Sequence, residues 1–354
     1  MSYFEVLSTE KAEAWRKKHN RLPQNQQDTY FTPDYYTLYE HLGDGKAQCF
    51  VFEKDGEIAL YPFLINSVNK KGYELDDEYF DIQGAYGYNG IISSNYSEAF
   101  RTEFFKKLDE YCNQNNIIAE FNRFHPVIDN VAFSRKFRKI IFDRSTVTID
   151  LAQKFEEIKR EFSSSTKRAL KKAHKNNLRP NVYQAKEMPI QRFKELYRNT
   201  MERVKSIPYL FFNDAYFEYL FQLQNLDMIT VEYEGKIIAS AVCFYSNNFY
   251  HYHLGASDEE YLNMRPNNLI FESMIKQGKE KNCKYLHLGG GNSGDENDGL
   301  YKFKKGFSKL RTDFYIGKKI HNQEIYESVI HQWKTKNPEA FTKFNHKILG
   351  YRDV

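Results

Sequence analysis

Two passages of this sequence predict the same order of secondary-structure elements, and this internal repeat constrains the fold more than any other feature. The first covers residues 49–65 and reads CFVFEKDGEIALYPFLI, and the second covers residues 228–245 and reads MITVEYEGKIIASAVCFY. Each contains two β-rich runs around a short turn, which is supplied by Asp55-Gly56 and by Glu234-Gly235. An acidic residue followed by glycine between two such runs is typical of a tight β-hairpin. Each passage therefore predicts one antiparallel hairpin.

The elements that follow the two hairpins also correspond. After the first hairpin come the aromatic and glycine-rich segment DIQGAYGYNGII, a helical pattern over residues 97–116 and a strand over 117–124. After the second come a strand over residues 249–257, a helical pattern over 267–282 and a strand over 284–290. Hairpin, strand, helix and strand at matching spacing predict a duplication of one mixed α/β unit of about 150 residues.

The remaining segments set the expected domain boundaries in this chain of 354 residues. A strand-like run over residues 145–151 separates the copies, and helical patterns follow it over 154–177 and 188–204. The segment after His321 is helical and is broken around Pro338, because proline ends or kinks a helix. We therefore expect a mixed α/β protein in three parts: a first domain over 1–145, a second domain over 146–320 and a C-terminal helical tail over 321–354.

Composition limits the classes of partner and the cellular location. The formal net charge is only +4, from 51 basic and 47 acidic residues, so an anionic partner must be bound by a local patch. The four cysteines are far apart and form no CxxC pair, which argues against a disulfide framework and against a zinc site. The N-terminal residues show no signal-peptide pattern, and the longest apolar run, residues 237–245, is too short to span a bilayer. We therefore expect a cytoplasmic protein.

A glycine-rich segment over residues 287–307, HLGGGNSGDENDGLYKFKKGF, is a candidate for a functional site. It lacks the Lys-Ser/Thr pair of a phosphate-binding P-loop and the spaced oxygen ligands of an EF-hand. Gly289, Gly290 and Gly291 are contiguous, whereas a dinucleotide-binding fingerprint needs spaced glycines. The segment therefore needs another explanation.

A hairpin followed by a strand and a helix resembles the core of the GNAT N-acyltransferase fold. In that fold the helix N-terminus binds the pyrophosphate of coenzyme A through a loop of the form Q/R-x-x-G-x-G/A. The corresponding residues here are 263–274, NMRPNNLIFESM, in which Arg265 matches the leading basic position and Asn267 and Asn268 follow it. Both glycines of the loop are absent, so the backbone cannot approach a pyrophosphate closely, and this weakens the expectation of ordinary acetyl-coenzyme A binding.

With the duplication, the chain resembles the Fem family of non-ribosomal peptidyl (aminoacyl) transferases, which build peptidoglycan cross-bridges, and their FemAB-like GNAT relatives. The motifs that carry this resemblance are the strand end Gly289-Gly290, FKKGF at 303–307, RPNNLIFESMI at 265–275, AYGYNG at 85–90 and FNRFHPV at 121–127. The resemblance covers roughly residues 25–320, and the long coiled-coil insertion of the family is absent. It implies tandem GNAT-like domains in a compact member of the family.

The resemblance implies a reaction centre at the end of the glycine-rich strand, with Lys304 and its neighbour Phe303 as catalytic residues. Attack of an amine on an ester or thioester carbonyl develops an oxyanion, which the Lys304 ammonium would stabilise. Gly289 and Gly290 would face the acceptor, because side chains there would obstruct it. No Ser-His-Asp or Cys-His arrangement is recognisable, so we expect direct transfer without a covalent enzyme intermediate. The alternative interpretations are core packing for Phe303 and an ordinary solvated side chain for Lys304.

The helical segment TKRALKKAHKNNL, residues 166–178, also resembles the family's and gathers basic side chains on one face. At helical spacing this face holds Arg168, Lys171, Lys172 and Lys175. Clustered cations repel one another, so the face favours a polyanionic partner such as a tRNA acceptor arm or a nucleotide diphosphate. We assign it to donor binding together with Arg265, Asn267 and Asn268. A solvated helix face is the alternative.

Residues from both copies are candidates for binding the acceptor. His251 and His253 lie on one side of a predicted strand with no acidic or cysteine ligand nearby, so we expect substrate contact or packing there and no metal. In the first copy, the residues that match the family's acceptor-groove segments are Tyr86, Tyr88, Arg123 and His125. Arg203 completes the acceptor set. Structural hydrogen bonding is the alternative for the residues of the first copy.

The resulting prediction is a transferase that moves an aminoacyl or acyl group to a primary amine of a cell-envelope precursor, in a peptidoglycan bridge-like reaction. Its donor would be aminoacyl-tRNA or acyl-coenzyme A as a co-substrate, with no tightly bound cofactor. The acceptor would be a nucleotide- or lipid-linked muropeptide or amino sugar, which allows peripheral contact with the inner face of the membrane. Two alternatives stay open: an acyl-coenzyme A-dependent N-acyltransferase that modifies an amino sugar for surface polysaccharide, and a non-catalytic RNA- or nucleotide-binding protein with the same fold.

Overall fold

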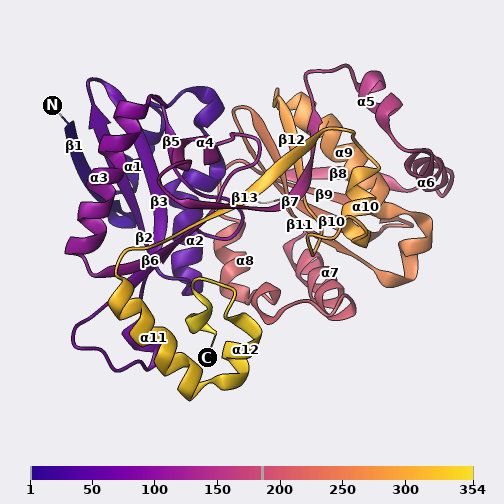
Figure 1. Ribbon diagram of the computed structural model, residues 1–354. Helices are drawn as coiled ribbons and strands as arrows, with labels where there is room; N and C mark the ends of the chain where they lie inside the picture. Colours follow the sequence, from indigo (N-terminus) through magenta and orange to yellow (C-terminus); the bar gives the residue numbers. More distant parts are fainter. Residues whose placement is uncertain (1, 185–186, 354) are drawn as a thin grey trace. The chain divides into compact units, whose positions relative to one another are not determined.

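The computed structural model describes residues 2–184 and 187–353 and divides into two compact units (Figure 1). Unit 1 consists of Met1–Asp143 and Phe314–Val354, and unit 2 consists of Arg144–Asp313. The division after Asp143 lies two residues before the boundary that the sequence predicts, after residue 145. The C-terminal segment, which we expected as a separate tail, groups with unit 1.

The sheet of unit 1 has the strand order β1-β2-β3-β4-β6-β13. These strands are β1 (Ser2–Ser8), β2 (Lys46–Lys54), β3 (Glu57–Ser67), β4 (Phe80–Gln83), β6 (Ile117–Arg123) and the C-terminal part of β13 (Arg311–Ile320). Neighbours are antiparallel except β4 and β6, which are parallel, and the short β5 (Ile92–Ser93) pairs with β3. The helices of the first sequence repeat are α1 (Ala12–His19), α2 (Pro33–Leu42), α3 (Glu98–Gln114) and α4 (Val131–Ser134).

Helix α3 shows why the sequence folds this way. Ser97 caps its N-terminus by accepting a hydrogen bond from the Phe100 N–H, and the helix then buries one apolar face. On that face Phe104 packs edge-to-face on Phe50 and Phe52 of β2, with ring centroids 5.6 and 5.8 Å apart. The aromatic residues of this repeat therefore form a core between α3 and the sheet.

The sheet of unit 2 has the corresponding order β7-β12-β11-β10-β9-β8. These strands are the C-terminal part of β7 (Lys139–Asp150), β12 (Tyr285–Gly289), β11 (Phe249–Ser257), β10 (Lys236–Ser246), β9 (Leu226–Tyr233) and β8 (Arg179–Gln184). Only β11 and β12 are parallel among the described pairs of this sheet. The helices are α5 (Phe155–Glu161), α6 (Ser164–Lys175), α7 (Ile190–Arg203), α8 (Asp214–Leu220), α9 (Pro266–Glu280) and α10 (Gly299–Lys305).

The two repeats match element by element, which confirms the predicted duplicated fold. The order β1-α1-α2-β2-β3-β4-α3-β6-α4-β7 corresponds to β8-α7-α8-β9-β10-β11-α9-β12-α10-β13. Both hairpin turns have positive φ at the two central residues: 52° and 86° at Asp55 and Gly56, and 49° and 80° at Glu234 and Gly235. Such angles are those of a type I′ turn, which suits the twist of a two-residue hairpin. The sequence signal at these turns was therefore sound.

The last strand of each repeat completes the sheet of the other repeat's unit. Strand β7 ends the first repeat, yet its residues Val147–Asp150 pair with β12 in unit 2. Strand β13 ends the second repeat, and its residues Ile316–Ile320 pair with β6 in unit 1. The strand predicted over 145–151 is thus the second part of a longer strand that begins at Lys139, and the division between the two units falls within that strand, after Asp143.

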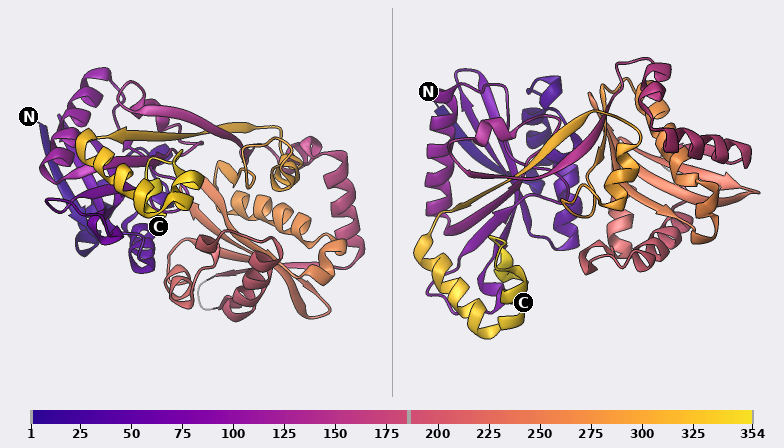
Figure 2. Two further views of the ribbon diagram at one scale, coloured as in Figure 1. Left: turned by 60° about the horizontal axis from the view of Figure 1, so that its bottom comes forward. Right: turned by 45° about the vertical axis from the view of Figure 1, so that its right-hand side comes forward.

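The C-terminal helices α11 (Gln323–Lys336) and α12 (Pro338–Phe344) pack on unit 1, as both views in Figure 2 show. Trp333 of α11 is fully buried in a cluster with Ile118 of β6 and Tyr351. The Tyr73 hydroxyl donates to the Tyr351 carbonyl at 2.6 Å and ties the end of the chain to the first repeat. The predicted helical tail and its break at Pro338 are confirmed, and apolar side chains pack this tail on unit 1.

Candidate functional site

The parallel strands β11 and β12 of unit 2 separate part-way along their length. Among the described residues their pairing runs from Phe249–Tyr285 to His251–His287 and stops there, although β11 continues to Ser257. Beyond this point β11 stays paired with β10, and β12 shifts its register against β7 before Gly289. The carboxyl ends of parallel strands that diverge are a common place for ligands in α/β folds.

Lys304 lies at the end of β12. Its side chain is only 6% exposed, and its Nζ donates a hydrogen bond to the Gly290 carbonyl at 2.7 Å. The same Nζ lies 5.4 Å from the ring centroid of Tyr252, the residue of β11 that follows the last paired position. The Lys304 ammonium is therefore placed beside the separating ends of both strands, within unit 2.

Burial changes the acidity of Lys304. Loss of hydration lowers the pKa of its amine to about 7; Asp298 opposes this shift and Arg144 adds to it. A lysine that titrates near neutral pH can hold a positive charge against a reacting oxygen or exchange a proton with an amine. Perturbed groups of this kind are concentrated in functional sites.

The loop after β12 is built around Asp298 and depends on glycine. Asp298 accepts hydrogen bonds from the Tyr301 N–H at 2.9 Å, which caps α10, and from the Asn292 N–H at 3.1 Å. Although burial opposes ionisation, these N–H groups hold the pKa of its carboxyl below the usual range. A Cβ on Gly291 would lie 2.3 Å from the Asp298 carboxylate, and Gly289 has a φ of +74°. The contiguous glycines therefore allow the chain to fold back over Asp298.

A chain of hydroxyl and imidazole groups runs beside the strand end. The Thr148 Oγ1 lies 3.0 Å from the His287 Nδ1 and 2.9 Å from the Thr312 Oγ1, which lies 2.8 Å from the Thr146 Oγ1. The ring of His251 lies 6.0 Å from that of His287. Sequence analysis missed Thr146, Thr148, His287 and Thr312, because strands far apart in sequence bring them together. The alternation of the two threonines in β7 was the one available signal.

Phe303 and His253 take structural positions in unit 2. The Phe303 ring packs on Phe271 and Phe307, with centroids 4.8 and 5.5 Å apart, which matches the core-packing interpretation. The His253 Nε2 lies 3.0 Å from the Tyr216 hydroxyl, and burial lowers the pKa of its imidazole to about 3. His253 is therefore neutral near pH 7.

The predicted donor residues at the start of α9 lie next to the end of β11. Arg265 has a φ of +69° and precedes Pro266, the first residue of the helix. The Asn268 N–H donates to the Arg265 carbonyl at 3.2 Å, and the Asn267 amide donates to the Ser257 hydroxyl at 3.3 Å. Because Pro266 has no N–H and that of Asn268 is engaged, this helix start offers few donors to a phosphate.

Arg203 holds the end of β11, while its predicted role in acceptor binding stays a prediction. Its guanidinium donates to the Ser257 carbonyl at 2.9 Å and to the Ser257 hydroxyl at 3.3 Å. The Thr200 hydroxyl and the Ser257 N–H add a further hydrogen bond of 3.0 Å. These contacts hold the C-terminal end of β11 in place, ahead of α9 in the chain.

The basic face of α6 is open to solvent. Its members Arg168, Lys171, Lys172 and Lys175 are exposed, and no ion pair joins them to any described residue. The opposite face buries Thr166, Leu170 and Ala173. A pocket of about 500 Å³ between α5, α6 and α9 is lined in part by Lys171 and His174. The structure thus keeps the predicted cations together without neutralising them.

The predicted residues of the first copy lie together in unit 1. Arg123 donates to the Gly84 and Ala85 carbonyls at 3.2 and 3.0 Å, next to Tyr86. His125 is fully buried, and the ring of Tyr88 lies 5.2 Å from its ring. The Nδ1 of His125 accepts hydrogen bonds from two backbone N–H groups, those of residues 127 and 128, at 3.2 and 3.0 Å. These contacts fit the structural alternative, while the acceptor role stays a prediction.

Residues 159–305 match the protein family described as Acetyltransferase (GNAT) domain. Most of unit 2 is therefore similar to a GNAT acetyltransferase domain. The GNAT match lies within unit 2, and the whole chain resembles solved structures of low sequence identity. FemX gives a TM-score of 0.68 at 15% identity over 92% of this chain and 99% of that one. Comparison with the curated proteins finds no match.

Two further solved structures extend the likeness. The C-terminal domain of a putative lysylphosphatidylglycerol synthetase from Agrobacterium fabrum gives a TM-score of 0.56 at 11% identity, covering 89% of this chain and 92% of that one. L-PGS from Bacillus licheniformis gives 0.54 at 14% identity, covering 83% and 90%. At such identities the likeness concerns the fold, and it confirms the predicted GNAT-like architecture and the resemblance to a Fem protein. Within residues 2–184 and 187–353, no helix is both long and apolar enough to cross a membrane.

Proposed function

We propose that this chain transfers an aminoacyl group from a charged tRNA to a primary amine of a cell-envelope precursor. The observation that carries the proposal is the burial of Lys304 at the end of β12, with its Nζ 2.7 Å from the Gly290 carbonyl. Burying a lysine without a carboxylate partner costs free energy, so packing alone gives no reason for it. A lysine placed where two parallel strands diverge favours a catalytic role.

In the proposed reaction the acceptor amine attacks the ester carbonyl of the donor and a tetrahedral intermediate forms. The carbonyl oxygen becomes an oxyanion, and the Lys304 ammonium compensates its charge. The bond from the carbonyl carbon to the ribose oxygen then breaks, the new amide bond remains, and the leaving ribose oxygen takes the proton that the amine loses. The Gly290 carbonyl engages one N–H of Lys304 and leaves its other donors for the substrate.

Direct attack also agrees with the state of the cysteines in unit 2. Cys243 and Cys283 are buried, and burial raises the pKa of the Cys243 thiol well above its ordinary value. A thiol nucleophile must ionise before it attacks a carbonyl. Neither cysteine is therefore suited to carry an acyl intermediate.

Two features favour tRNA over coenzyme A as the donor. The start of α9 has Pro266 where a pyrophosphate-binding loop would offer N–H groups, and the α6 face carries cations without acidic partners. One fold neighbour is named a putative lysylphosphatidylglycerol synthetase, and lysyl is an aminoacyl group. We further propose that the reaction takes place in the cytoplasm, with a nucleotide- or lipid-linked muropeptide or amino sugar as acceptor.

The donor experiment compares the two co-substrates directly. The full chain is incubated with charged tRNA or with acyl-coenzyme A, together with muropeptide or amino-sugar precursors, and transfer is followed by mass spectrometry. Transfer from charged tRNA is expected. Transfer from acyl-coenzyme A to an amino sugar would establish the second candidate, which the description of residues 159–305 as an acetyltransferase domain favours.

Replacing Lys171, Lys172 and Lys175 with alanine tests the α6 face. If this face binds tRNA, the triple variant should bind more weakly and show a shallower dependence of log Kd on log salt, because fewer counterions are released. A matched triple variant carries three exposed lysines of unit 1, Lys70, Lys71 and Lys106, as alanine. An unchanged salt slope in the α6 variant would mean that the face is only solvated. Binding of tRNA without transfer to any acceptor would favour a non-catalytic RNA-binding protein.

A further inference from the structure

A second pocket lies in unit 1, where strands β7 and β13 meet the C-terminal helices. It has a volume of about 440 Å³. Its lining residues are Phe137, Arg138, Lys139, Lys318, Lys319, Ile320, Tyr326, Asn345, His346, Lys347 and Ile348. Six of them are basic or histidine, and no acidic residue lines the pocket among the residues that the structure describes. This lining is strongly biased toward positive charge in a chain whose overall charge is close to balanced.

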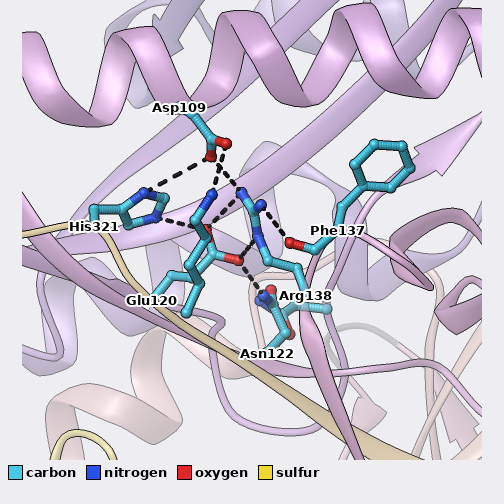
Figure 3. A network of polar contacts seen from close by, with 8 residues as sticks. Asp109, Glu120, Asn122, Phe137, Arg138 and His321 are labelled. Carbon is cyan, nitrogen blue, oxygen red and sulfur yellow. Dashed lines mark hydrogen bonds and ion pairs between the residues drawn. The ribbon is translucent and has the colours of Figure 1, made fainter.

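The deeper basic residues of the pocket already have acidic partners. Figure 3 shows Arg138 between Glu120 and Asp109, with the Arg138–Asp109 contact at 3.1 Å. His321 lies 3.0 Å from the Glu120 carboxylate, and Lys319 lies 2.6 Å from that of Asp109. Although burial opposes it, Arg138 and His321 hold the pKa of Glu120 low, so the carboxylate stays ionised. In this network the basic side chains are paired with carboxylates, so these contacts hold the deeper side chains of the pocket in place.

Two of the outer lysines of the pocket have no carboxylate partner among the described residues. Lys347 contacts Asp353 at 3.1 Å, but no ion pair joins Lys139 or Lys318 to any described residue. Partial burial lowers the pKa of Lys318, and the neighbouring charge of Lys139 lowers it further. Two like charges held close together repel each other, and an anion placed between them would remove that cost.

We propose that this pocket of unit 1 binds the phosphoryl or diphosphate group of a small molecule between Lys139 and Lys318. The volume lies in the range of small-molecule sites, which is roughly 300–1,000 Å³. Phe137, Ile320 and Tyr326 offer apolar surface to the rest of such a molecule. The site is separate from Lys304, and it does not depend on the acyl-transfer proposal.

Calorimetric titration of the full chain tests the proposal with three probes: inorganic phosphate, inorganic pyrophosphate and uridine diphosphate. Saturable binding of pyrophosphate at one site per chain is expected. Lys139→Gln and Lys318→Gln should each weaken it roughly tenfold or more, because each removes a charge-assisted hydrogen bond. Lys318→Arg keeps the charge and should retain most of the affinity. Tighter binding of uridine diphosphate than of pyrophosphate would identify an organic diphosphate as the ligand class.

Matched variants separate this site from general attraction of anions. Lys106→Gln removes an exposed lysine of α3 in the same unit and should leave the affinity unchanged. Lys171→Gln removes a lysine of the α6 face, and it should lower the affinity for pyrophosphate only if that face, and not this pocket, is the binding site. The proposal fails if none of the probes binds saturably, if Lys106→Gln weakens binding as much as Lys318→Gln, or if Lys171→Gln alone removes it. Circular dichroism of each variant shows whether the fold is retained.

Discussion

The parallel strand pairs of the two units end differently, although their strand order is the same. In unit 1 the segment after β4 closes onto β6: the Asn89 N–H donates to the Arg123 carbonyl, and the Asn89 side-chain oxygen accepts from the Arg123 N–H, both at 2.6 Å. In unit 2 the pairing of β11 with β12 stops at His251 and His287, and Lys304 lies at the strand end. One repeat thus fills its strand end with a buried amide, and the other holds a buried cation there.

The short helices that follow these strands differ in the same way. Helix α4 of unit 1 buries Val131 and Phe133, whereas α10 of unit 2 buries Tyr301 and Lys304. The strand order therefore determines where in each unit a site can form. A few side chains at the strand end determine whether that site can catalyse a reaction. The comparison indicates a stabilising role for the end of β6, and it is consistent with the catalytic role that we propose for the end of β12.

The largest expected effect comes from Lys304→Met, which removes the cation and keeps most of the apolar bulk. If the ammonium stabilises the oxyanion, kcat should fall by ~100-fold or more while KM for the acceptor stays nearly constant. Steady-state kinetics with the donor identified above measure both quantities. The Lys304 ammonium interacts with a negative charge that develops only in the transition state. The substitution should therefore lower kcat without weakening substrate binding.

Lys305→Met is the matched control for this change. Lys305 is the next residue of α10, but it is exposed and points about 100° away from Lys304. Its substitution should change kcat by less than about threefold, since it removes no buried charge. Similar mild effects at both positions would mean that unit 2, like unit 1, uses this strand end for packing.

The pH dependence of the unfolding free energy tests whether burial shifts the pKa of Lys304. The pKa of Lys304 is about 7 in the folded protein, below its ordinary value of 10.5, so the unfolded chain binds more protons between these pH values. The contribution of this group to stability therefore rises as the pH increases through that window. The difference in unfolding free energy between the wild type and Lys304→Met should shift in favour of the wild type by roughly 1 kcal/mol per pH unit above 7.

Urea denaturation of both proteins between pH 7 and pH 10 measures this shift. If Lys304 acts as a cation, its contribution to kcat should decline over the same interval in which its contribution to stability rises. A difference in unfolding free energy that does not change with pH would show that Lys304 keeps an ordinary pKa. Lys304 would then stay protonated over most of this interval, and its contribution to kcat should not decline.

Sequence patterns predicted the elements whose signals are local. The two hairpins, α3, α9 and the glycine-ended β12 all follow from turn residues and hydrophobic periodicity over short windows. Lys304 was chosen as a candidate because it lies in a motif with Gly289 and Gly290, and the structure shows that it is buried there, while its catalytic role stays a proposal. The exchange of β7 and β13 between units was missed, since no local pattern states which strand a distant strand will pair with. The polar chain of Thr148, His287 and Thr312 was missed for the same reason.

Asn89→Ala should destabilise unit 1 and so tests the other side of the comparison. The substitution removes the partner of the Arg123 N–H and the Asn89 donor to the Asn122 Oδ1, while the Asn122 side-chain amide still donates to Glu120. Each unsatisfied buried group costs about 1–3 kcal/mol, so the unfolding free energy of unit 1 should fall by at least ~2 kcal/mol. Tryptophan fluorescence during urea denaturation follows this unit, because the two tryptophans, Trp15 and Trp333, both lie in it.

Asn113→Ala is the control for Asn89→Ala, since Asn113 is exposed in the last turn of α3. It should change the unfolding free energy by less than about 0.5 kcal/mol. If Asn89→Ala has an equally small effect, Asn89 does not hold the strand end of unit 1 closed. The contrast between the two units would then rest on Lys304 alone.

The smallest expected effect concerns the hairpin turns, where the two repeats should behave alike. Gly56 and Gly235 have φ values of +86° and +80°, and no described atom lies within 4 Å of a Cβ added at either position. Alanine at either turn therefore meets no clash, and its cost is the left-handed backbone alone, about 1–2 kcal/mol. Gly56→Ala and Gly235→Ala should lower the unfolding free energy by equal amounts, within roughly 0.5 kcal/mol.

Asparagine tolerates this conformation better, so Gly56→Asn and Gly235→Asn should each recover part of the loss. Unequal losses would show that the two turns contribute differently to the stability of their units, despite their similar backbone angles. The repeats would then be equivalent in backbone structure but not in energetics.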